Sequence, residues 1–195
     1  MEVSITSDEK SFDRNLLRKI SEGNHDAFRL FYDTHYPRAN RFVSYFIKNH
    51  DIRDELVSDV FFNIWQNREK LPGIANFNAY FYTSIRNRAL DHIRKSKGSI
   101  TEEPLEIGFV TNVNTPEELL LNEELHRKVA EAIEELPERC KLIFLMAKSE
   151  GLKYREVAEI LNISEKTVNA QMVIALRKLG DALLNYLRMV VLFPV

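Results

Sequence analysis

The sequence predicts an all-α protein of two small helical domains joined by a flexible, acidic linker. Apolar residues recur at three- and four-residue spacing through most of the chain, which is the period of amphipathic helices. An acidic segment near residue 100, with prolines and a glycine, interrupts this pattern. Near the C-terminus, two short amphipathic patterns stand three residues apart, as in a helix-turn-helix motif. We therefore expect domains at residues 1–98 and 116–195, with a linker at residues 99–115.

The composition is that of an ordinary soluble protein. The chain has 195 residues, of which 45% are hydrophobic and 29% charged, and its formal net charge is −2. Any nucleic-acid surface must therefore come from local basic patches. The single cysteine, Cys140, excludes a disulfide framework and a cysteine-based zinc site. The polar N-terminus is no signal peptide, and no apolar run approaches the roughly 20 residues of a membrane helix, so we expect a cytoplasmic protein without membrane insertion.

Three helices are predicted before residue 70. Phe12–Ser21 is a short amphipathic helix, and Asn24 or Asp26 can cap the next one. Pro37 predicts a kink in that helix or the first turn of a new segment. Residues 49–51 are expected to form a turn, with Asp51 or Asp54 capping the helix that follows.

The helix expected at Asp54–Arg68 has one broad apolar stripe and one polar face. Trp65 and Phe62 stand beside the stripe, where aromatic side chains next to charges are typical of protein-docking surfaces. Both rings could instead belong to the core, and for Phe62 the core is the favoured interpretation.

A loop at Leu71–Phe77, marked by Pro-Gly, precedes a helix expected at Asn78–Lys97. Residues 71–98 contain five basic side chains and one acidic one, a local charge of +4. Aromatic residues beside these cations favour single-stranded nucleic acid, because bases stack on rings while cations hold phosphates. A solvated basic helix face is the alternative. The candidate stacking rings are Phe77, Tyr80 and Tyr82, whereas Phe81 and Ile85 are expected in the core.

Residues 99–124 are strongly acidic, with seven glutamates and no lysine or arginine. Their first part is the predicted linker, and Thr115-Pro116 predicts the start of the next helix. Further on, Tyr154–Leu161 and a helix capped by Ser164 form the helix-turn-helix pattern. The second helix has an apolar stripe at Val168, Met172, Ala175, Leu176 and Leu179. An ordinary helical hairpin inside an all-α core would show the same pattern.

Two separate parts of the chain resemble the extracytoplasmic-function (ECF) group of bacterial RNA polymerase sigma factors, in the sigma-70 family. Ala27–Pro37, Asp54–Asn67 and Asn76–Lys95 resemble sigma region 2, which is a helical bundle. Ala132–Leu179 resembles sigma region 4, which is a helix-turn-helix domain. Each part alone is moderately specific, whereas both in this order with an acidic linker between them are highly specific.

The resemblance implies three interfaces. The helix at Asp54–Asn67 would dock on the clamp-helices coiled coil of the largest polymerase subunit. Its core-polymerase-binding residues would be Asp54, Glu55, Asp59, Asn63, Trp65 and Gln66. The next helix would melt and hold the promoter minus-10 element, and the loop before it would capture a flipped base. The implied minus-10 residues are Asn76, Phe77, Tyr80, Arg86, Asn87, Arg88, His92, Arg94 and Lys95.

The recognition helix of region 4 would read the minus-35 element as duplex DNA. The implied residues are Glu165, Lys166, Asn169, Ala170, Val173 and Arg177. Family members usually carry several arginines along this helix, whereas here the basic residues are Lys166, Arg177 and Lys178. This departure indicates a greater dependence on DNA shape or on the polymerase scaffold. Ile174 is expected to be an exposed apolar position that an inhibitory partner covers.

The expected partners are therefore core RNA polymerase, promoter DNA and an anti-sigma factor, with no small-molecule substrate. We expect no cofactor, no metal and no catalytic activity, because the five histidines lack metal-binding spacing and the chain has no Gly-rich phosphate loop. The alternative function is a stand-alone helix-turn-helix regulator that binds duplex operator DNA.

Overall fold

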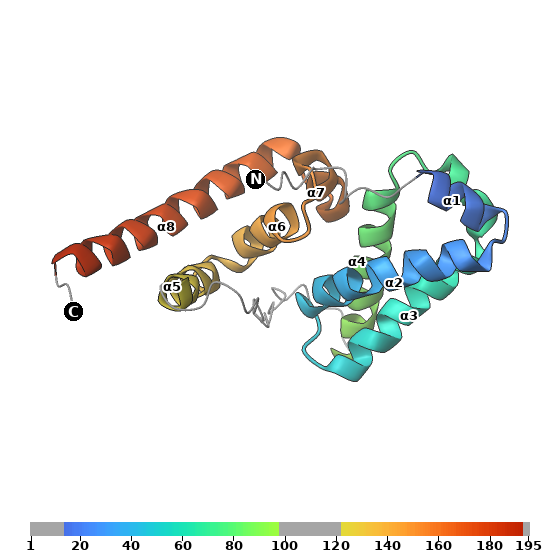
Figure 1. Ribbon diagram of the computed structural model, residues 1–195, viewed down its shortest axis with the longest axis horizontal. Coiled ribbons are helices and arrows are strands. Elements are labelled where there is room, and N and C mark those ends of the chain that lie inside the picture. Colours follow the sequence, from blue (N-terminus) through green and yellow to red (C-terminus); the bar gives the residue numbers. More distant parts are fainter. Residues whose placement is uncertain (1–13, 98–121, 193–195) are drawn as a thin grey trace.

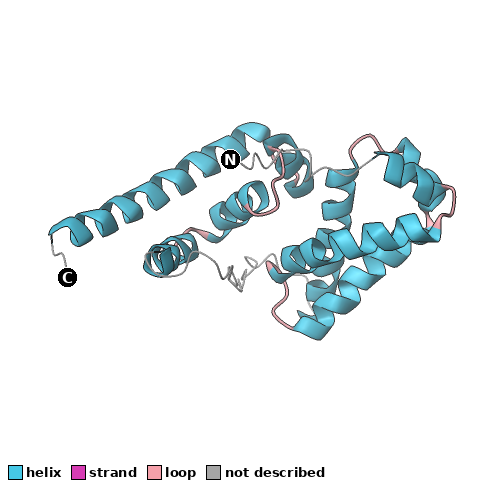
Figure 2. Cartoon of the chain, viewed as in Figure 1, coloured by secondary structure: helices cyan, strands magenta, loops and turns pink. Residues whose placement is uncertain are grey.

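Helices form every regular element in the part of the chain that the computed structural model describes, residues 14–97 and 122–192 (Figures 1 and 2). The N-terminal unit comprises α1 (Arg14–Ser21), α2 (His25–Ser44), α3 (His50–Gln66), a 3-10 helix η1 (Arg68–Gly73) and α4 (Phe77–Lys97). The C-terminal unit comprises α5 (Asn122–Glu134), α6 (Glu138–Lys148), α7 (Tyr154–Leu161) and α8 (Glu165–Leu192). The all-α, two-part architecture predicted from the sequence is confirmed. The predicted linker lies outside the described residues, so the domain boundaries stay a prediction.

An aromatic cluster holds the N-terminal bundle together. Phe31 of α2 lies 5.3 Å from Phe61 of α3 and 6.0 Å from Phe81 of α4, measured between ring centroids. Phe61 and Phe81 are 5.6 Å apart, with an edge-on orientation that aromatic pairs favour. One ring from each of three helices therefore fixes how α2, α3 and α4 pack.

The helix starts differ from the predicted ones by a few residues. The Asn24 side chain accepts a hydrogen bond from the Ala27 amide and caps α2. Asn49 caps α3 in the same way, so neither Asp51 nor Asp54 is the cap. Pro37 neither ends α2 nor starts a new helix, because its exposed ring lies opposite a continuous buried face.

The predicted loop at residues 71–77 is partly helical. Its first part belongs to η1, and α4 begins at Phe77, one residue earlier than predicted. The Asn76 side chain accepts a hydrogen bond from the Ala79 amide, which caps α4. The start of α4 is therefore held in place next to η1.

The C-terminal unit contains the predicted helix-turn-helix, formed by α7 and α8. Asn162 ends α7 in the left-handed conformation, with φ of 53°, which asparagine tolerates better than most residues. The Ser164 hydroxyl accepts a hydrogen bond from the Thr167 amide, so the predicted N-cap is confirmed. Val168 and Met172 are buried as expected, but Leu176 is exposed because it lies to one side of the buried stripe.

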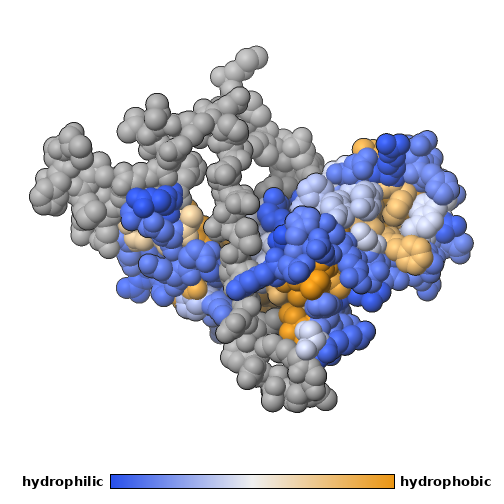
Figure 3. Space-filling view, turned by 90° about the horizontal axis from the view of Figure 1, so that it is seen from below, coloured by the Kyte–Doolittle hydropathy of each residue, from blue (hydrophilic) through white to orange (hydrophobic). Residues whose placement is uncertain are grey.

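The two units lie against each other along α4 and α7, in green and orange in Figure 1. One hydrophobic cluster runs from the α2–α4 bundle into α6, α7 and α8. The visible surface of the described residues is mainly hydrophilic, with small separate apolar patches (Figure 3). Contact between the units places the two predicted DNA-binding parts of the chain in one body.

Candidate nucleic-acid interface

A cavity of about 530 Å³ opens between α3, η1 and α4. Its walls combine amide, hydroxyl and basic side chains with a few apolar ones. The lining residues are Val60, Asn63, Ile64, Asn67, Lys70, Leu71, Ile74, Tyr80, Ser84, Asn87, Arg88 and Asp91. A site that combines an aromatic ring with several polar groups suits an unstacked base, which needs both a ring contact and hydrogen bonds on its edge.

The cavity brings together some of the predicted minus-10 residues. Tyr80, Asn87 and Arg88 line it, at spacings that place them on one face of α4 at about 100° per residue. By the same spacing, Arg94 and Lys95 continue this face beyond the cavity, and both are exposed. We call these five residues the α4 basic face.

Arg86 lies away from the α4 basic face. Its helical position is rotated by more than about 90° from Tyr80, and it is half-buried. Burial and the charge of Arg94 lower the pKa of Arg86. His92 is also half-buried and lies near the packed side of the helix. The structure therefore separates Arg86 and His92 from the residues at the cavity.

Two ion pairs position arginine side chains of the α4 basic face. Arg88 of α4 lies 3.7 Å from the Asp59 carboxylate of α3, and both side chains are half-exposed. Arg94 lies 2.6 Å from Asp91, one turn earlier in the same helix. Because these pairs are open to solvent, a phosphate can compete for the guanidinium groups at little cost.

The aromatic predictions for α4 divide into three outcomes. Tyr80 is 37% exposed at the cavity and remains available for stacking. Phe77 is only 6% exposed and packs on Phe31, so its predicted DNA contact is wrong. Tyr82 is also buried, whereas the predicted core pair Phe81 and Ile85 is confirmed. The bundle needs a ring at residue 77 because α4 starts there against α2.

Asn76 does not line the cavity. Besides capping α4, its side-chain amide donates a hydrogen bond of 3.2 Å to the Glu159 carboxylate of α7. In this structure Asn76 therefore faces the C-terminal unit.

Four polar cavity residues were missed from the sequence: Asn67, Lys70, Ser84 and Asp91. Ser84 could have been found, because it lies one turn from both Tyr80 and Arg88 on the same helix face. Asn67 and Lys70 could not, since they approach α4 only through the 3-10 turn that follows α3.

The predicted minus-35 residues form one exposed stripe on α8. Lys166, Ala170, Val173 and Arg177 follow helical spacing on the side opposite the buried Val168 and Met172. Glu165 and Asn169 border this stripe and are exposed too. The Asn169 side-chain amide donates a hydrogen bond to the Glu165 carbonyl oxygen, at 3.1 Å. Ile174 is exposed, as predicted.

The predicted polymerase-docking face of α3 is only partly open. Glu55 and Gln66 are exposed, and the half-buried Asp54 carboxylate accepts hydrogen bonds from Tyr36 and Asn40. Burial and the nearby Asp54 raise the pKa of the Tyr36 hydroxyl to about 12. This hydroxyl therefore remains a donor, which holds the Asp54 side chain in place.

Trp65 and Phe62 of α3 exchange their expected roles. Trp65 is half-buried, with its ring 4.7 Å from His25, 4.9 Å from Phe28 and 4.7 Å from the Arg68 guanidinium. Phe62 is 59% exposed, so its favoured placement in the core is wrong. Residue 62 lies beyond the edge of the buried stripe, whereas Trp65 covers the gap between α2 and η1.

Residues 14–97 and 122–192 hold no group of three or more His, Cys, Asp or Glu side chains that could bind a metal ion. None of the helices in this part of the chain is long and apolar enough to span a membrane.

Two family models match the chain in succession. Sigma-70 region 2 matches residues 31–98, and the model described as sigma-70, region 4 matches residues 126–179. The first match contains the cavity and the α4 basic face. The second contains the helix-turn-helix and the exposed stripe of α8.

Curated relatives and solved structures agree with these matches. The ECF RNA polymerase sigma-E factors of Haemophilus influenzae and Escherichia coli are 27% and 26% identical, and each alignment covers 84% of this chain and 90% of the relative. A structure of CnrH in complex with the cytosolic domain of CnrY is 22% identical, with a TM-score of 0.56, and covers 89% of this chain and 97% of its own. RpoE from Bartonella quintana, solved with the anti-sigma factor NepR, is 19% identical with a TM-score of 0.53. This match covers 80% of our chain and 96% of the RpoE chain. The chain belongs to the sigma-70 family of RNA polymerase sigma factors, in the ECF group.

Proposed function

We propose that this chain is a sigma factor that binds core RNA polymerase and directs it to specific promoters for transcription initiation. The observation that carries this proposal is the succession of sigma regions 2 and 4 in one chain, each with its own candidate DNA surface. A stand-alone operator-binding regulator would use the helix-turn-helix but would leave the cavity of the N-terminal unit without a role.

The cavity and the α4 basic face are the proposed minus-10 site. A base that leaves the duplex can stack on Tyr80 and offer its edge to the Asn87 amide. Arg88, Arg94 and Lys95 then lie along one side of α4, where they can hold successive phosphates of the displaced strand. This division of roles predicts sequence selection at the cavity and affinity along the helix.

The exposed stripe of α8 is the proposed minus-35 site. A recognition helix places its first turns in the major groove, where Lys166 can reach guanine or phosphate and Asn169 can reach adenine. Three basic residues supply less charge than family members usually carry. We therefore expect the isolated α8 surface to bind duplex DNA weakly and to depend on the polymerase for its position.

The outer face of α3 is the proposed polymerase-docking surface. Glu55, Asp59 and Gln66 provide polar contacts, and the exposed Phe62 adds an apolar one. Asn63, which was also predicted for this surface, lines the cavity instead. Asp59→Lys should weaken binding of the free protein to core polymerase by about tenfold or more, because it reverses the charge of a side chain in the proposed polar interface. Asp181→Lys, on the exposed surface of α8, is the matched control and should bind normally.

An anti-sigma factor is a further proposed partner. The RpoE structure with NepR shows such a complex for a protein of this fold. In this chain Val173 of the proposed minus-35 surface and the neighbouring Ile174 and Leu176 are exposed apolar side chains. Their burial by an inhibitor would also block access to DNA.

Reconstituted transcription tests the proposed function directly. Core polymerase with the purified protein should start at discrete promoters of its own genome, whereas core polymerase alone should not. A gel shift with and without core polymerase distinguishes a sigma factor, which needs the polymerase to bind promoter DNA well, from a stand-alone regulator, which binds operator DNA by itself. Strong binding of operator DNA by the free protein, with no specific start in transcription, would contradict the proposal. We propose no catalytic activity and a site of action in the cytoplasm, where polymerase and promoters are found.

A further inference from the structure

A second cavity lies next to the cavity of the proposed minus-10 site, between α1 and η1. Its volume is about 300 Å³. Arg14, Leu17 and Arg18 of α1 line one side, and residues 71–75 line the other. We call this second cavity the α1 groove, and the first one the minus-10 cavity. Because α1 precedes both segments that match the family models, those matches assign no role to the α1 groove.

The α1 groove and the minus-10 cavity share part of their lining. Leu71 and Ile74 line both of them. Leu71 is buried in the core, whereas Ile74 is only half-buried, so part of its side chain is exposed where the two cavities meet. A chain molecule that leaves the minus-10 cavity on this side therefore passes Ile74 and reaches the α1 groove.

The direction of α4 places the α1 groove on the path of the proposed strand. The helix begins at Phe77, directly after residues 71–75, and its phosphate-holding residues lie toward its other end. Arg88 and Lys95 lie roughly 12 and 23 Å along the helix axis from Tyr80, at 1.5 Å per residue. A strand that follows these cations to Tyr80 and continues in the same direction meets residues 71–75 next.

The lining of the α1 groove has the chemistry that a nucleic-acid strand requires. Arg14 and Arg18 are one helical turn apart, so they lie on the same face of α1. The residues that line the α1 groove include no acid, so they carry a charge of +2. Leu17, Pro72 and Ile74 supply the apolar part of the lining, and side chains of this kind pack against bases. The cations can hold phosphates while the apolar side chains contact sugars and bases.

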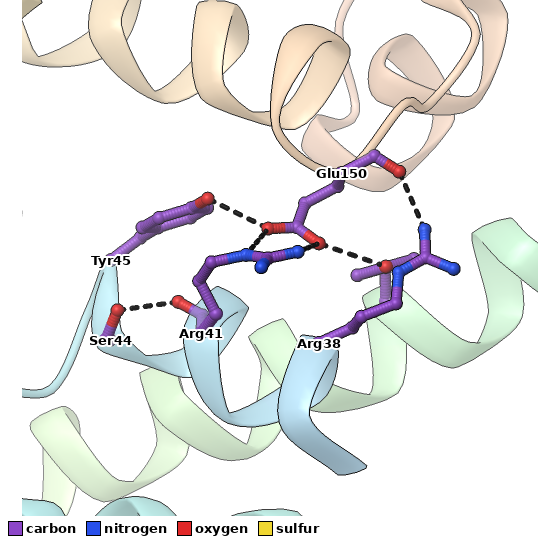
Figure 4. A network of polar contacts seen from close by, with 6 residues as sticks. Arg38, Arg41, Ser44, Tyr45 and Glu150 are labelled. Atoms are coloured by element: carbon purple, nitrogen blue, oxygen red, sulfur yellow. Dashed lines mark hydrogen bonds and ion pairs between the residues drawn. The ribbon is translucent and has the colours of Figure 1, made fainter. Parts of the chain in front are cut away.

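The arginines of the N-terminal unit differ in how easily a phosphate can reach them. Arg41 donates to the two carboxylate oxygens of Glu150 at 2.9 and 3.2 Å, and Arg38 donates to the Glu150 carbonyl oxygen at 2.8 Å (Figure 4). Glu150 is only 1% exposed, so separating it from Arg41 would be costly. By contrast, the side chains of Arg18 and its partner Glu22 are 60% and 56% exposed. A phosphate can replace Glu22 at little cost, because exposed ion pairs contribute little free energy.

We propose that the α1 groove binds the nucleotides of the single strand that adjoin the base captured in the minus-10 cavity. Arg14 and Arg18 each hold a phosphate of these nucleotides, and the apolar lining contacts their sugars and bases. The identity of the strand rests on the proposed function. The α1 groove thereby lengthens the site that α4 begins.

Binding of short DNA strands to the polymerase holoenzyme tests this inference. One labelled strand contains only the minus-10 segment of a promoter found by reconstituted transcription, and two others extend it by three nucleotides at the 5′ or the 3′ end. The double variant Arg14→Ala/Arg18→Ala should bind one of the extended strands roughly five- to tenfold more weakly, as measured by fluorescence anisotropy. Its affinity for the short strand and for the other extended strand should not change. For the affected strand, the slope of log affinity against log salt should become shallower by about 1.4, since each phosphate contact to a single strand contributes about 0.7.

Two control proteins show whether position and charge both matter. Lys19→Ala removes an exposed cation of α1 that does not line the α1 groove, and it should bind all three strands normally. Arg14→Lys/Arg18→Lys keeps both charges and should retain most of the affinity, because lysine also binds phosphate. Circular dichroism checks that the helix content of each variant is intact. Equal binding of both extended strands by Arg14→Ala/Arg18→Ala and Lys19→Ala would overturn the proposal, and so would an equal loss on all three strands.

The short strand separates this inference from the proposed function. Holoenzyme that binds the short strand no better than a strand of scrambled sequence would reject the proposed function, and the inference with it. Specific binding of the short strand, with extensions whose binding does not depend on Arg14 and Arg18, would reject only the role of the α1 groove.

Discussion

The helices α4 and α8 both carry predicted DNA-binding residues, but these residues differ in how many of them are exposed at the surface. On α8, all six predicted residues are exposed, and most follow one stripe. On α4, the nine predicted residues of the helix and its cap divide among the cavity, the exposed surface beyond it, a half-buried side of the helix, the core and the junction with α7. The two helices have similar amphipathic sequences, so the difference comes from their surroundings.

Helical spacing identifies a surface only where a helix packs on one side. The helix α8 packs against α5, α6 and α7, but its buried residues Val168, Met172, Ala175 and Leu179 follow a single stripe. The opposite stripe is therefore free by geometry. By contrast, α4 packs against α2, α3 and α7, which approach it from several directions. Its aromatic residues therefore include core, junction and cavity positions that spacing alone cannot separate.

The largest expected effect is a loss of stability when Phe77, a buried residue of α4, is replaced. Phe77→Ala should lower the free energy of unfolding by about 3–5 kcal/mol, because it removes a buried ring that packs on Phe31 and Phe81. Thermal or chemical denaturation measures the loss. Val173→Ala on α8 removes an exposed apolar side chain and should change the stability by less than about 0.5 kcal/mol. A stable Phe77→Ala protein with a defect only in DNA binding would return Phe77 to the DNA surface.

A pH-dependent effect is expected at His35 in the same bundle. Burial, together with the nearby Arg38 charge, lowers the pKa of His35 from 6.5 to about 4. Between these values the unfolded chain binds a proton that the folded chain does not, so the stability falls as the pH decreases from 6.5 to about 4. The loss should be up to about 3 kcal/mol.

Unfolding of His35→Leu between pH 4 and 7 measures this contribution. The variant should lose less stability on acidification than the unaltered protein, and the two should show the same trend above pH 6.5. Equal acid sensitivity of both proteins would show that His35 is protonated at its ordinary pKa.

Tyr80 should behave as the DNA-facing counterpart of Phe77. Tyr80→Ala should weaken binding of the polymerase holoenzyme to a promoter with a single-stranded minus-10 segment by about 1–3 kcal/mol, the usual range for a stacked base. Fluorescence anisotropy with a labelled DNA measures it. Unchanged affinity together with a stability loss as large as that of Phe77→Ala would place Tyr80 in the core.

The smallest expected effect concerns the start of α8. Ser164→Ala should destabilise the C-terminal unit by about 1 kcal/mol, because the Thr167 amide loses its hydrogen-bond acceptor. Ser164→Asp should restore the cap, as aspartate is an equally good N-cap residue. Identical stabilities for all three proteins would show that the cap does not determine where α8 begins.

Local chemistry in the sequence was sufficient for much of the fold. Apolar spacing found the helices, and the Ser164 cap and the short turn located the helix-turn-helix. The errors arose where competing local signals were equally good: Asn49, Asp51 and Asp54 can all cap a helix, and Pro37 can be tolerated on the exposed side of a long one. Packing decides between such alternatives, and packing is not a local property.

The site was less predictable because its parts come from distant positions. Asn67 and Lys70 meet α4 only through the path of η1, and the outward position of Phe62 depends on how far α2 covers α3. Glu150 gave no signal at all in the sequence, since a lone glutamate after a helix is usually solvated. Its burial follows from two arginines and two tyrosines that lie far from it along the chain.

One measurement tests most directly the central claim that the two units have different DNA tasks. Open-complex formation is compared on a fully duplex promoter and on the same promoter with a mismatched bubble at the minus-10 element. Arg88→Ala should slow it by about tenfold on the duplex, and the bubble should relieve part of the defect, because the free energy of strand opening has already been supplied. Lys166→Ala should weaken binding on both templates equally, since it contacts duplex DNA. Equal relief of both variants by the bubble, or relief of neither, would contradict the account.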